Sequence, residues 1–186
     1  MSGHSHWAGI KHKKEITDKK RGKVFSKLLA LISAAAKTEP NPDFNPRLRT
    51  AVATAREANV PQENIERAIR RAADAGENLE ELVFEAYGPG GAALLIEAIS
   101  NNRNRTVQEV KLVLKECGGK WAETGSVRWA FEKDDGGKSG EGEEGGGAWK
   151  ARFPQKLSAD DNMGLARIVE ALEDNDDVQN VYTNAG

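Results

Sequence analysis

The stretch from residue 82 to 117, LVFEAYGPGGAALLIEAISNNRNRTVQEVKLVLKEC, decides the fold class because its hydrophobic period changes within it. Side chains alternate over 82–87, a Gly-Pro-Gly-Gly turn follows, and 92–100 is an aliphatic run, which together predict a β-hairpin. Apolar residues then recur at helical spacing from Val107, and Thr106 with Glu109 matches a capping box, so we expect a helix that starts at Thr106. The pattern predicts an antiparallel sheet covered by helices.

The residues before this stretch predict helices only. A helix is expected from about residue 17, with an apolar stripe at helical spacing from Val24 to Ala35. Asn45 and Pro46 form a typical helix start, and Pro61 opens another helix. Short helices can bury their apolar faces only against one another. Residues 17–80 are therefore expected to form a three-helix domain.

The residues after it predict the rest of an α+β domain. Val127, Trp129 and Phe131 alternate with polar neighbours and predict a strand, whereas residues 133–147, KDDGGKSGEGEEGGG, predict a flexible linker. A short strand at 148–153, a helix capped by Ser158 and a last strand at 178–182 follow. We expect residues 81–132 and 148–186 to form one ferredoxin-like α/β domain, from which the linker extends.

Composition restricts the class of protein. The chain has 186 residues, of which 38% are hydrophobic, and no apolar run approaches the roughly 18 residues of a membrane span. The N-terminus lacks the apolar core of a signal peptide. The single cysteine, Cys117, cannot form an internal disulfide. These features predict a soluble, cytoplasmic protein.

Charge is distributed unevenly along the chain. Residues 1–37 carry nine Lys or Arg against two acidic residues, a net charge of +7, whereas 132–147 carry −4 and 148–186 carry −3. Such asymmetry predicts a polyanionic partner at the basic end, and nucleic acid before a membrane surface.

The first 16 residues are expected to form a basic arm that binds nucleic acid. Lysines neutralise phosphates without a fixed register, and indole and imidazole rings stack on unpaired bases. The expected binding residues in the arm and the helix that follows it are Trp7, Lys11, His12, Lys13, Lys14, Lys19, Lys20, Arg21 and Lys23. The alternative is a solvated tail.

A second contact is expected in the segment SNNRNRT at 100–106. Arg103 and Arg105 would lie beside a helix N-terminus, where guanidinium groups bind a phosphate or a base edge, although asparagines there are also ordinary turn residues. Five arginines of the helical domain either extend this surface or pair with helix glutamates: Arg47, Arg49, Arg67, Arg70 and Arg71.

Catalytic and metal sites are not expected. All three histidines, His4, His6 and His12, lie in the arm without a cysteine or acidic partner, so they make neither a general base on a rigid scaffold nor a built metal site. We expect a binding protein without a cofactor. A protein-interaction adaptor, docking through Leu94, Ile96 or the acidic C-terminal helix, is the competing class.

An ordered set of motifs identifies a family. The segments GHSHWAGIKHKK, KRGKVFSKL, NPRLR, PQENIERAI, FEAYGPGGAALLIEAISNNRNRTVQEVK, GSVRWAF and LEDNDDVQNVYTN together resemble the YebC/PmpR family. The resemblance implies a helical first domain and two α/β domains, the third inserted into the second. In this chain the inserted domain is expected to be largely missing, with the 133–147 linker in its place, and His6 stands where the family usually has Lys.

The resemblance also implies regulation of gene expression. Two routes are associated with the family: probable transcriptional regulators that bind DNA, and translation activators that act with the ribosome and would bind ribosomal RNA. On physical grounds RNA is favoured, because the chain has no motif for reading a major groove and a basic arm with an aromatic suits irregular RNA surfaces.

Overall fold

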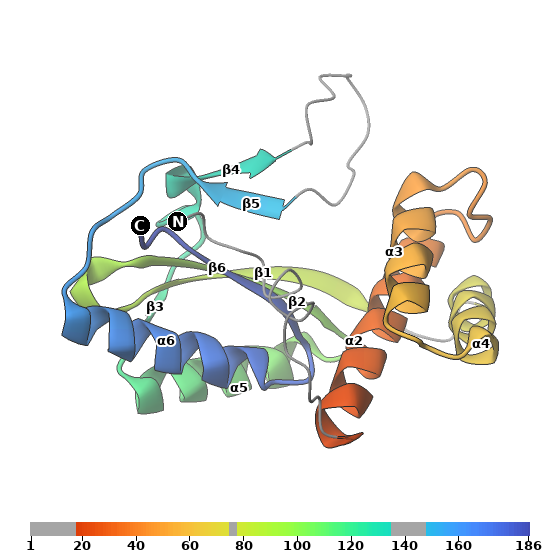
Figure 1. Cartoon of the computed structure of the whole chain (residues 1–186), viewed down its shortest axis with the longest axis horizontal. Helices are drawn as coiled ribbons and strands as arrows, with labels where there is room; N and C mark the ends of the chain where they lie inside the picture. Colours follow the sequence, from red (N-terminus) through yellow and green to blue (C-terminus); the bar gives the residue numbers. More distant parts are fainter. Residues whose placement is uncertain (1–17, 75–77, 135–147) are drawn as a thin grey trace. The chain divides into compact units, whose positions relative to one another are not determined.

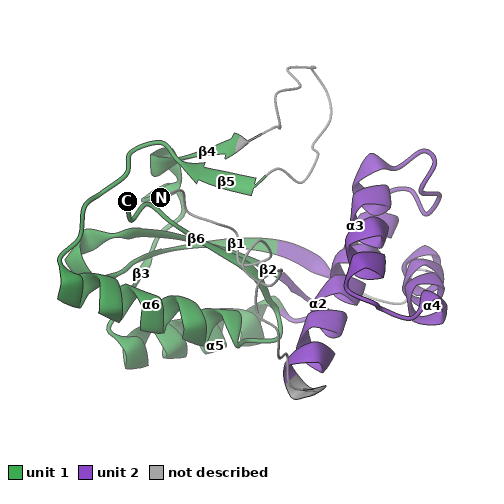
Figure 2. Ribbon diagram, viewed as in Figure 1, with its two compact units in different colours: residues 1–13, 82–98, 103–186 green, residues 14–81, 99–102 purple. Residues whose placement is uncertain are grey.

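The computed structural model describes residues 18–74, 78–134 and 148–186. Two compact units are distinguished in Figure 2. Described residues up to 81, together with 99–102, form a helical unit. Residues 82–98 and the described residues from 103 onward form an α+β unit.

The helical unit contains α2 (Asp18–Ala36), α3 (Pro46–Glu57) and α4 (Gln62–Ala73). Its core is small and alanine-rich: apart from Leu28, Ile32, Leu48 and Ile65, most of its buried apolar side chains are alanines. Small side chains let α2 lie close to both other helices. The structure confirms the predicted helical domain.

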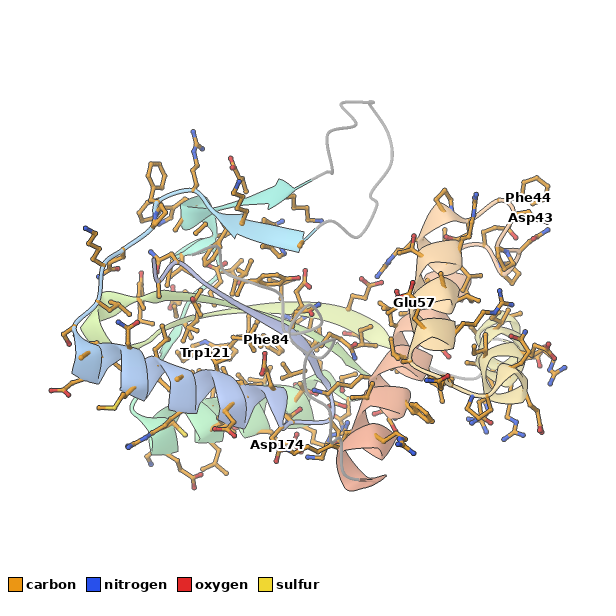
Figure 3. The ribbon with its side chains drawn as sticks, viewed as in Figure 1. Asp43, Phe44, Glu57, Phe84, Trp121 and Asp174 are labelled. Carbon is orange, nitrogen blue, oxygen red and sulfur yellow. The ribbon has the colours of Figure 1, made fainter. Side chains whose placement is uncertain are left out.

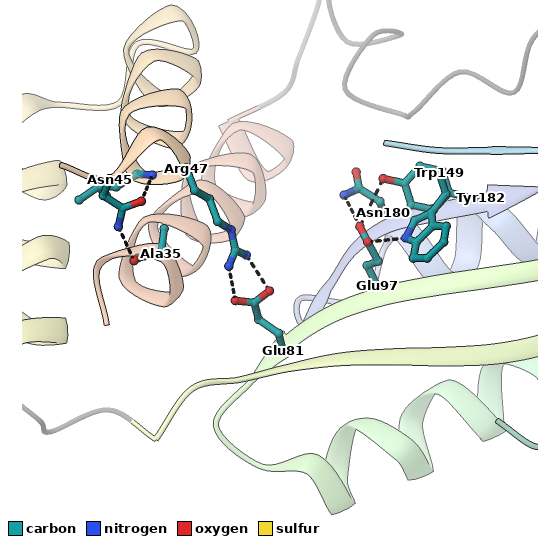
Figure 4. A network of polar contacts seen from close by, with 9 residues as sticks. Ala35, Asn45, Arg47, Glu81, Glu97, Trp149, Asn180 and Tyr182 are labelled. Atoms are coloured by element: carbon teal, nitrogen blue, oxygen red, sulfur yellow. Dashed lines mark hydrogen bonds and ion pairs between the residues drawn. The ribbon is translucent and has the colours of Figure 1, made fainter. Parts of the chain in front are cut away.

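The connection between α2 and α3 is closed by one asparagine. Asn45 is 8% exposed; its side-chain oxygen accepts from the N–H of Leu48 (2.9 Å), and its amide donates to the carbonyls of Ala35 (2.9 Å) and Glu39 (2.7 Å), as Figure 4 shows in part. Pro46 follows at the first helical position, where a missing N–H costs nothing. The predicted helix start is therefore also a tertiary contact.

The α+β unit is built on a four-stranded sheet. Along the chain come β1 (Glu80–Tyr87), the short 3₁₀ turn η1 (Pro89–Gly91), β2 (Ala93–Ser100), α5 (Arg103–Cys117), β3 (Lys120–Ala122), η2 (Arg128–Ala130), β4 (Phe131–Asp134), β5 (Ala148–Ala151), α6 (Ala159–Glu173) and β6 (Val178–Thr183). The sheet order is β3-β1-β2-β6, and β4 pairs with β5 in a separate antiparallel ribbon.

The sheet is covered on both faces. Figure 1 shows α5 and α6 side by side along one face, where Leu94 and Ile96 of β2 meet helix residues such as Val110 and Ile168. A second core lies on the opposite face: Ala93 and Leu95 of β2 cluster with Val127, Ala130, Phe131, Trp149 and Tyr182. Alternate residues of β2 thus enter different cores, which explains why the strand is an almost continuous aliphatic run.

The turn between β1 and β2 follows the predicted Gly-Pro-Gly-Gly sequence. Gly90 and Gly91 have φ angles of +66° and +77°, which favour glycine. A Cβ on Gly90 would also lie 2.9 Å from Leu157. The glycines are needed for both backbone conformation and space.

Three local predictions were wrong. The helix α5 begins at Arg103, and Thr106 lies inside it, donating its hydroxyl to Asp177 (2.6 Å) instead of capping. Residues 128–130 form a 3₁₀ turn and the strand begins only at Phe131, because buried Glu85 holds the preceding loop. That strand also continues through Lys133 and Asp134, the first two residues of the predicted linker.

One strand was missed by the sequence analysis, and the predicted fold class is confirmed. The short strand β3 was not predicted at all, since three residues give no period. The α+β fold class is confirmed, and none of the described helices has the length and hydropathy needed to cross a bilayer.

Candidate nucleic-acid interface

The predicted arm falls outside the described residues. Trp7, Lys11, His12, Lys13 and Lys14 belong to residues 1–17, so their assignment to nucleic-acid binding stays a prediction. Residues 135–147 of the linker expected at 133–147 also lie outside the described residues.

The basic start of α2 is within the described helix. Lys20 and Arg21 are exposed and Lys23 is half-buried, while Lys19 belongs to the same helical turn. Further along α2, Leu28 and Ile32 are fully buried. One end of the helix is therefore basic and solvent-exposed, and its C-terminal part builds the core.

The two arginines of the predicted second contact lie in the first turn of α5. Arg103 is exposed. Arg105 donates to the carboxylate of Asp177 (2.8 Å) and lies 3.8 Å from Glu109; its hydrogen bond and charge interaction with Asp177 raise the pKa of Arg105. A phosphate at Arg105 would compete with Asp177, so Arg103 is the more accessible of the two.

Some arginines of the helical unit form ion pairs, and some line a cavity. Arg47 makes a two-pronged contact with Glu81 (2.7 and 2.6 Å), shown in Figure 4, and Arg67 pairs with Glu63 (2.7 Å). Arg67 and Arg71 also line an open cavity of about 480 Å³. Pairing with a helix glutamate, the alternative to a nucleic-acid role, thus accounts for Arg67, whereas the partner of Arg47 lies on strand β1.

A buried glutamate organises a site that sequence reasoning missed. Glu85, 3% exposed on β1, accepts three backbone N–H groups from one loop: those of Gly125 (2.7 Å), Val127 (2.7 Å) and Arg128 (3.0 Å). Carboxylates bound in this way fix a loop in one conformation. The only signal in the sequence was a glutamate inside the mainly apolar segment 82–87, LVFEAY.

The loop held by Glu85 presents an exposed indole. Trp129 is 63% exposed, yet its ring N–H donates to the carbonyl of Ser126 (2.8 Å), which also accepts from the Tyr87 hydroxyl (3.2 Å). The ring of Phe153, 51% exposed, lies 5.7 Å from that of Trp129. We call Trp129 and Phe153 the aromatic platform.

The other aromatic residues labelled in Figure 3 are either packed in the α+β unit or exposed without a neighbouring ring in the part of the chain that the structure describes. In Figure 3, Phe84 and Trp121 lie together in the α+β unit, with ring centroids 5.4 Å apart, and Phe84 is buried. Phe44, labelled beside Asp43 in the helical unit, is 77% exposed. Among the described residues no other aromatic ring contacts Phe44, so it differs from the paired rings of the aromatic platform.

The ribbon beside the aromatic platform is held by a second glutamate. Glu97 of β2 accepts from the indole N–H of Trp149 (2.8 Å), the amide of Asn180 (3.2 Å) and the hydroxyl of Tyr182 (3.3 Å), as drawn in Figure 4. Burial, followed by the charge of Glu97, raises the pKa of Tyr182 far above its usual value. Tyr182 therefore stays neutral, and its hydroxyl donates a hydrogen bond to the carboxylate of Glu97.

Positive charge surrounds the aromatic platform. Residues 125–133 and 148–157 carry five Lys or Arg against one acidic residue, Glu132, which faces Lys150 across the ribbon. The guanidinium of Arg152 lies 5.4 Å from the Phe153 ring, and the cations of Arg128 and Lys133 lie 5.1 and 5.3 Å from the Trp149 ring. Among the described residues no group of His, Cys, Asp and Glu is arranged to hold a metal ion.

Comparison with known families identifies the chain. A family model described as the TACO1/YebC protein N-terminal domain matches residues 5–75, and one described as the TACO1/YebC second and third domain matches residues 79–135. The chain belongs to the TACO1/YebC family. The second match ends at residue 135, one residue beyond the end of β4.

Individual relatives support the assignment along the whole chain. A "probable transcriptional regulatory protein" of Solibacter usitatus is 38% identical over 235 residues, covering 99% of this chain and 95% of the relative. A protein of the same description from Aquifex aeolicus is 52% identical over 136 residues, covering 72% of this chain and 55% of the relative. Since the first alignment is longer than this chain's 186 residues, that TACO1/YebC relative has residues without a counterpart here.

A solved structure has the same fold. The crystal structure of a conserved hypothetical protein from Aquifex aeolicus superposes with a TM-score of 0.85 at 34% identity, covering 98% of this chain and 97% of that chain. The combination of a helical unit and an α+β unit is thus shared with another protein.

Proposed function

We propose that this chain is a non-enzymatic regulator of gene expression that binds nucleic acid through its basic N-terminal arm and the start of α2. The observation that carries the proposal is the net charge of +7 on residues 1–37 in a chain whose overall charge is −2. Clustered lysines and arginines release counterions from a phosphate backbone, which gives strong, sequence-independent attraction.

Two further observations support this role. Several TACO1/YebC relatives are named probable transcriptional regulatory proteins. Lys20 and Arg21 are exposed at the start of α2, so the basic stretch continues on a rigid helix. Contacts made from a helix have a fixed spacing and would position the arm on its target.

The regulator could act in transcription, by binding DNA, or in translation, by binding ribosomal RNA. DNA binding in transcription follows the names of the relatives; binding to ribosomal RNA as a translation activator is the alternative, favoured by the lack of a motif for reading a major groove. Cross-linking in cells, followed by sequencing of both RNA and DNA, separates them. Discrete promoters select transcription, and enrichment of ribosomal RNA selects translation. A cytoplasmic location, inferred from the sequence, is compatible with both.

Paired charge substitutions test the binding surface. Lys13→Gln with Lys14→Gln removes two charges from the arm, and Lys115→Gln with Lys120→Gln removes two exposed charges from the α+β unit as a matched control. Affinity for duplex DNA and for RNA is measured as a function of salt. We expect the arm variant to weaken binding and to reduce the salt slope by about 0.7 to 0.9 for each lost phosphate contact, and the control to do neither.

Deletion of residues 2–14 is the decisive extension of this test. Unchanged affinity for both nucleic acids after the deletion would contradict the proposed binding site. Capture of a protein partner that is insensitive to salt and accompanied by no nucleic acid would favour the adaptor class instead.

A further inference from the structure

The aromatic platform has features that the proposed arm site does not use. Trp129 and Phe153 are both more than half exposed, although large apolar side chains are usually buried. Their rings lie 5.7 Å apart with an interplanar angle of 47°. They form a continuous apolar surface on the α+β unit, and no third aromatic ring of the described residues contacts it.

The aromatic platform is rigid before anything binds to it. The Trp129 indole donates to Ser126, and the backbone around it is fixed by the three N–H groups that Glu85 accepts. On the other side, the N–H of Arg152 donates to the carbonyl of Ala130 (2.8 Å), which ties the Phe153 segment to η2. A ring that is already immobilised loses little conformational entropy on binding, so its exposed face is a favourable stacking surface.

The charge around the aromatic platform points to the occupant. Five cationic residues against one acidic residue give the segments 125–133 and 148–157 a net charge of +4, in a chain whose overall charge is negative. Lys150, Arg152 and Lys156 are all exposed. A hydrophobic protein partner would need no such charge, whereas a strand with bases and phosphates would use both the rings and the cations.

We infer that the aromatic platform is a second binding site for single-stranded nucleic acid, in which an unpaired base stacks on Trp129 or Phe153 while Arg128, Arg152 and Lys150 contact the adjacent phosphates. The site consists of residues other than those proposed for the arm, and it rests on the proposed function only in assuming that nucleic acid is the physiological partner. Double-stranded nucleic acid is not a good ligand, because its bases are already stacked on one another.

The test uses the full chain and three probes: a short oligouridine, an abasic oligonucleotide of the same length, and an RNA duplex. Trp129→Ala combined with Phe153→Ala is expected to lower affinity for oligouridine by about tenfold. The salt slope and the affinity for the abasic strand should stay unchanged, because phosphate contacts are retained. The single variant Trp129→Phe keeps an aromatic ring at this position and should therefore retain most of the wild-type affinity for oligouridine.

Two matched variants make the result specific. Phe44→Ala removes an exposed aromatic from the helical unit and should not change binding. Arg152→Gln leaves Phe153 in place and should reduce the salt slope by about 0.7 on a single strand. This second variant also tests the site if the double alanine variant does not fold.

The outcomes separate this inference from the proposed function. Unchanged affinity of the alanine variant for oligouridine overturns the inference, as does an equal loss on the abasic strand. Concentration-dependent self-association of the wild type that the same variant abolishes, without an effect on oligouridine, would assign the aromatic platform to a second copy of the chain. If the variants Lys13→Gln and Lys14→Gln change nothing while the alanine variant weakens oligouridine binding, the arm assignment fails and the second site stands.

Discussion

The two units use polar side chains in different ways. In the helical unit, Asn45 and Ser33 connect helix ends and neighbouring helices, Ser33 donating to the carbonyl of Ala68 (3.2 Å). In the α+β unit, Glu85 and Glu97 connect strands to a loop and a ribbon. The difference follows from the backbone: helices satisfy their own N–H groups except at the first turn, whereas an irregular loop needs an acceptor from elsewhere.

The comparison implies that the loop depends on its carboxylate more than a helix depends on its cap. Glu85→Ala leaves three N–H groups without their acceptor, and we expect the free energy of unfolding to fall by about 3 kcal/mol. Urea denaturation measures the loss, and hydrogen exchange of residues 125–128 locates it. Glu85→Gln, which keeps the shape and one acceptor oxygen, should lose less. Unchanged exchange in that loop would contradict the role given to Glu85.

The corresponding change in the helical unit is Asn45→Ala. It removes the cap of α3 and two donated hydrogen bonds, so we expect a loss of about 2 kcal/mol in the free energy of unfolding, measured in the same way. Asn45→Asp separates the two contributions, since a carboxylate still caps Leu48 but cannot donate to Ala35 and Glu39. A loss from Asn45→Ala as large as that from Glu85→Ala would remove the distinction between the units.

The glutamate network also predicts a pH dependence for the α+β unit. Because the pKa of Tyr182 is raised in the folded state, the folded protein keeps a proton that the unfolded chain releases near pH 10, and stability is lost above about that pH. The wild type should lose about 1 kcal/mol of unfolding free energy by about pH 11 through this group, and Tyr182→Phe should not. Urea midpoints at neutral and alkaline pH, compared between the two proteins, check this. An identical alkaline loss in both would refute it.

The smallest effect is expected at the surface of the helical unit. The ion pair of Arg47 and Glu81 has good geometry, but its side chains are 31% and 49% exposed. Arg47→Ala should therefore cost less than about 1 kcal/mol, and high salt should remove most of the difference. A double-mutant cycle with Glu81→Ala measures the coupling. A coupling as large as the effect of Asn45→Ala would show that exposed charges, too, hold this unit together.

Sequence predicted the elements with strong periodicity. The stripe of α2, the hairpin around the Gly-Pro-Gly-Gly turn and the caps at Asn45 and Ser158 were all found, because each depends on neighbours within a few residues. The errors occurred where a hydrogen bond to a residue distant in sequence determines the local conformation. Thr106 looked like a cap but bonds to Asp177, and the alternation at 127–131 looked like a strand but is bent by Glu85.

The candidate site, too, has parts that the sequence predicts and parts that depend on contacts between distant residues. The sequence alone established the excess of positive charge in residues 1–37, from which the nucleic-acid partner is predicted, because net charge is a sum over residues and requires no fold. Only the tertiary structure decided that Trp129 and Phe153, 24 positions apart, form one exposed surface, and that Arg105 is held by Asp177. The physical reason is that stacking and ion pairing act over a few ångströms, and such proximity between distant residues exists only after the chain has folded.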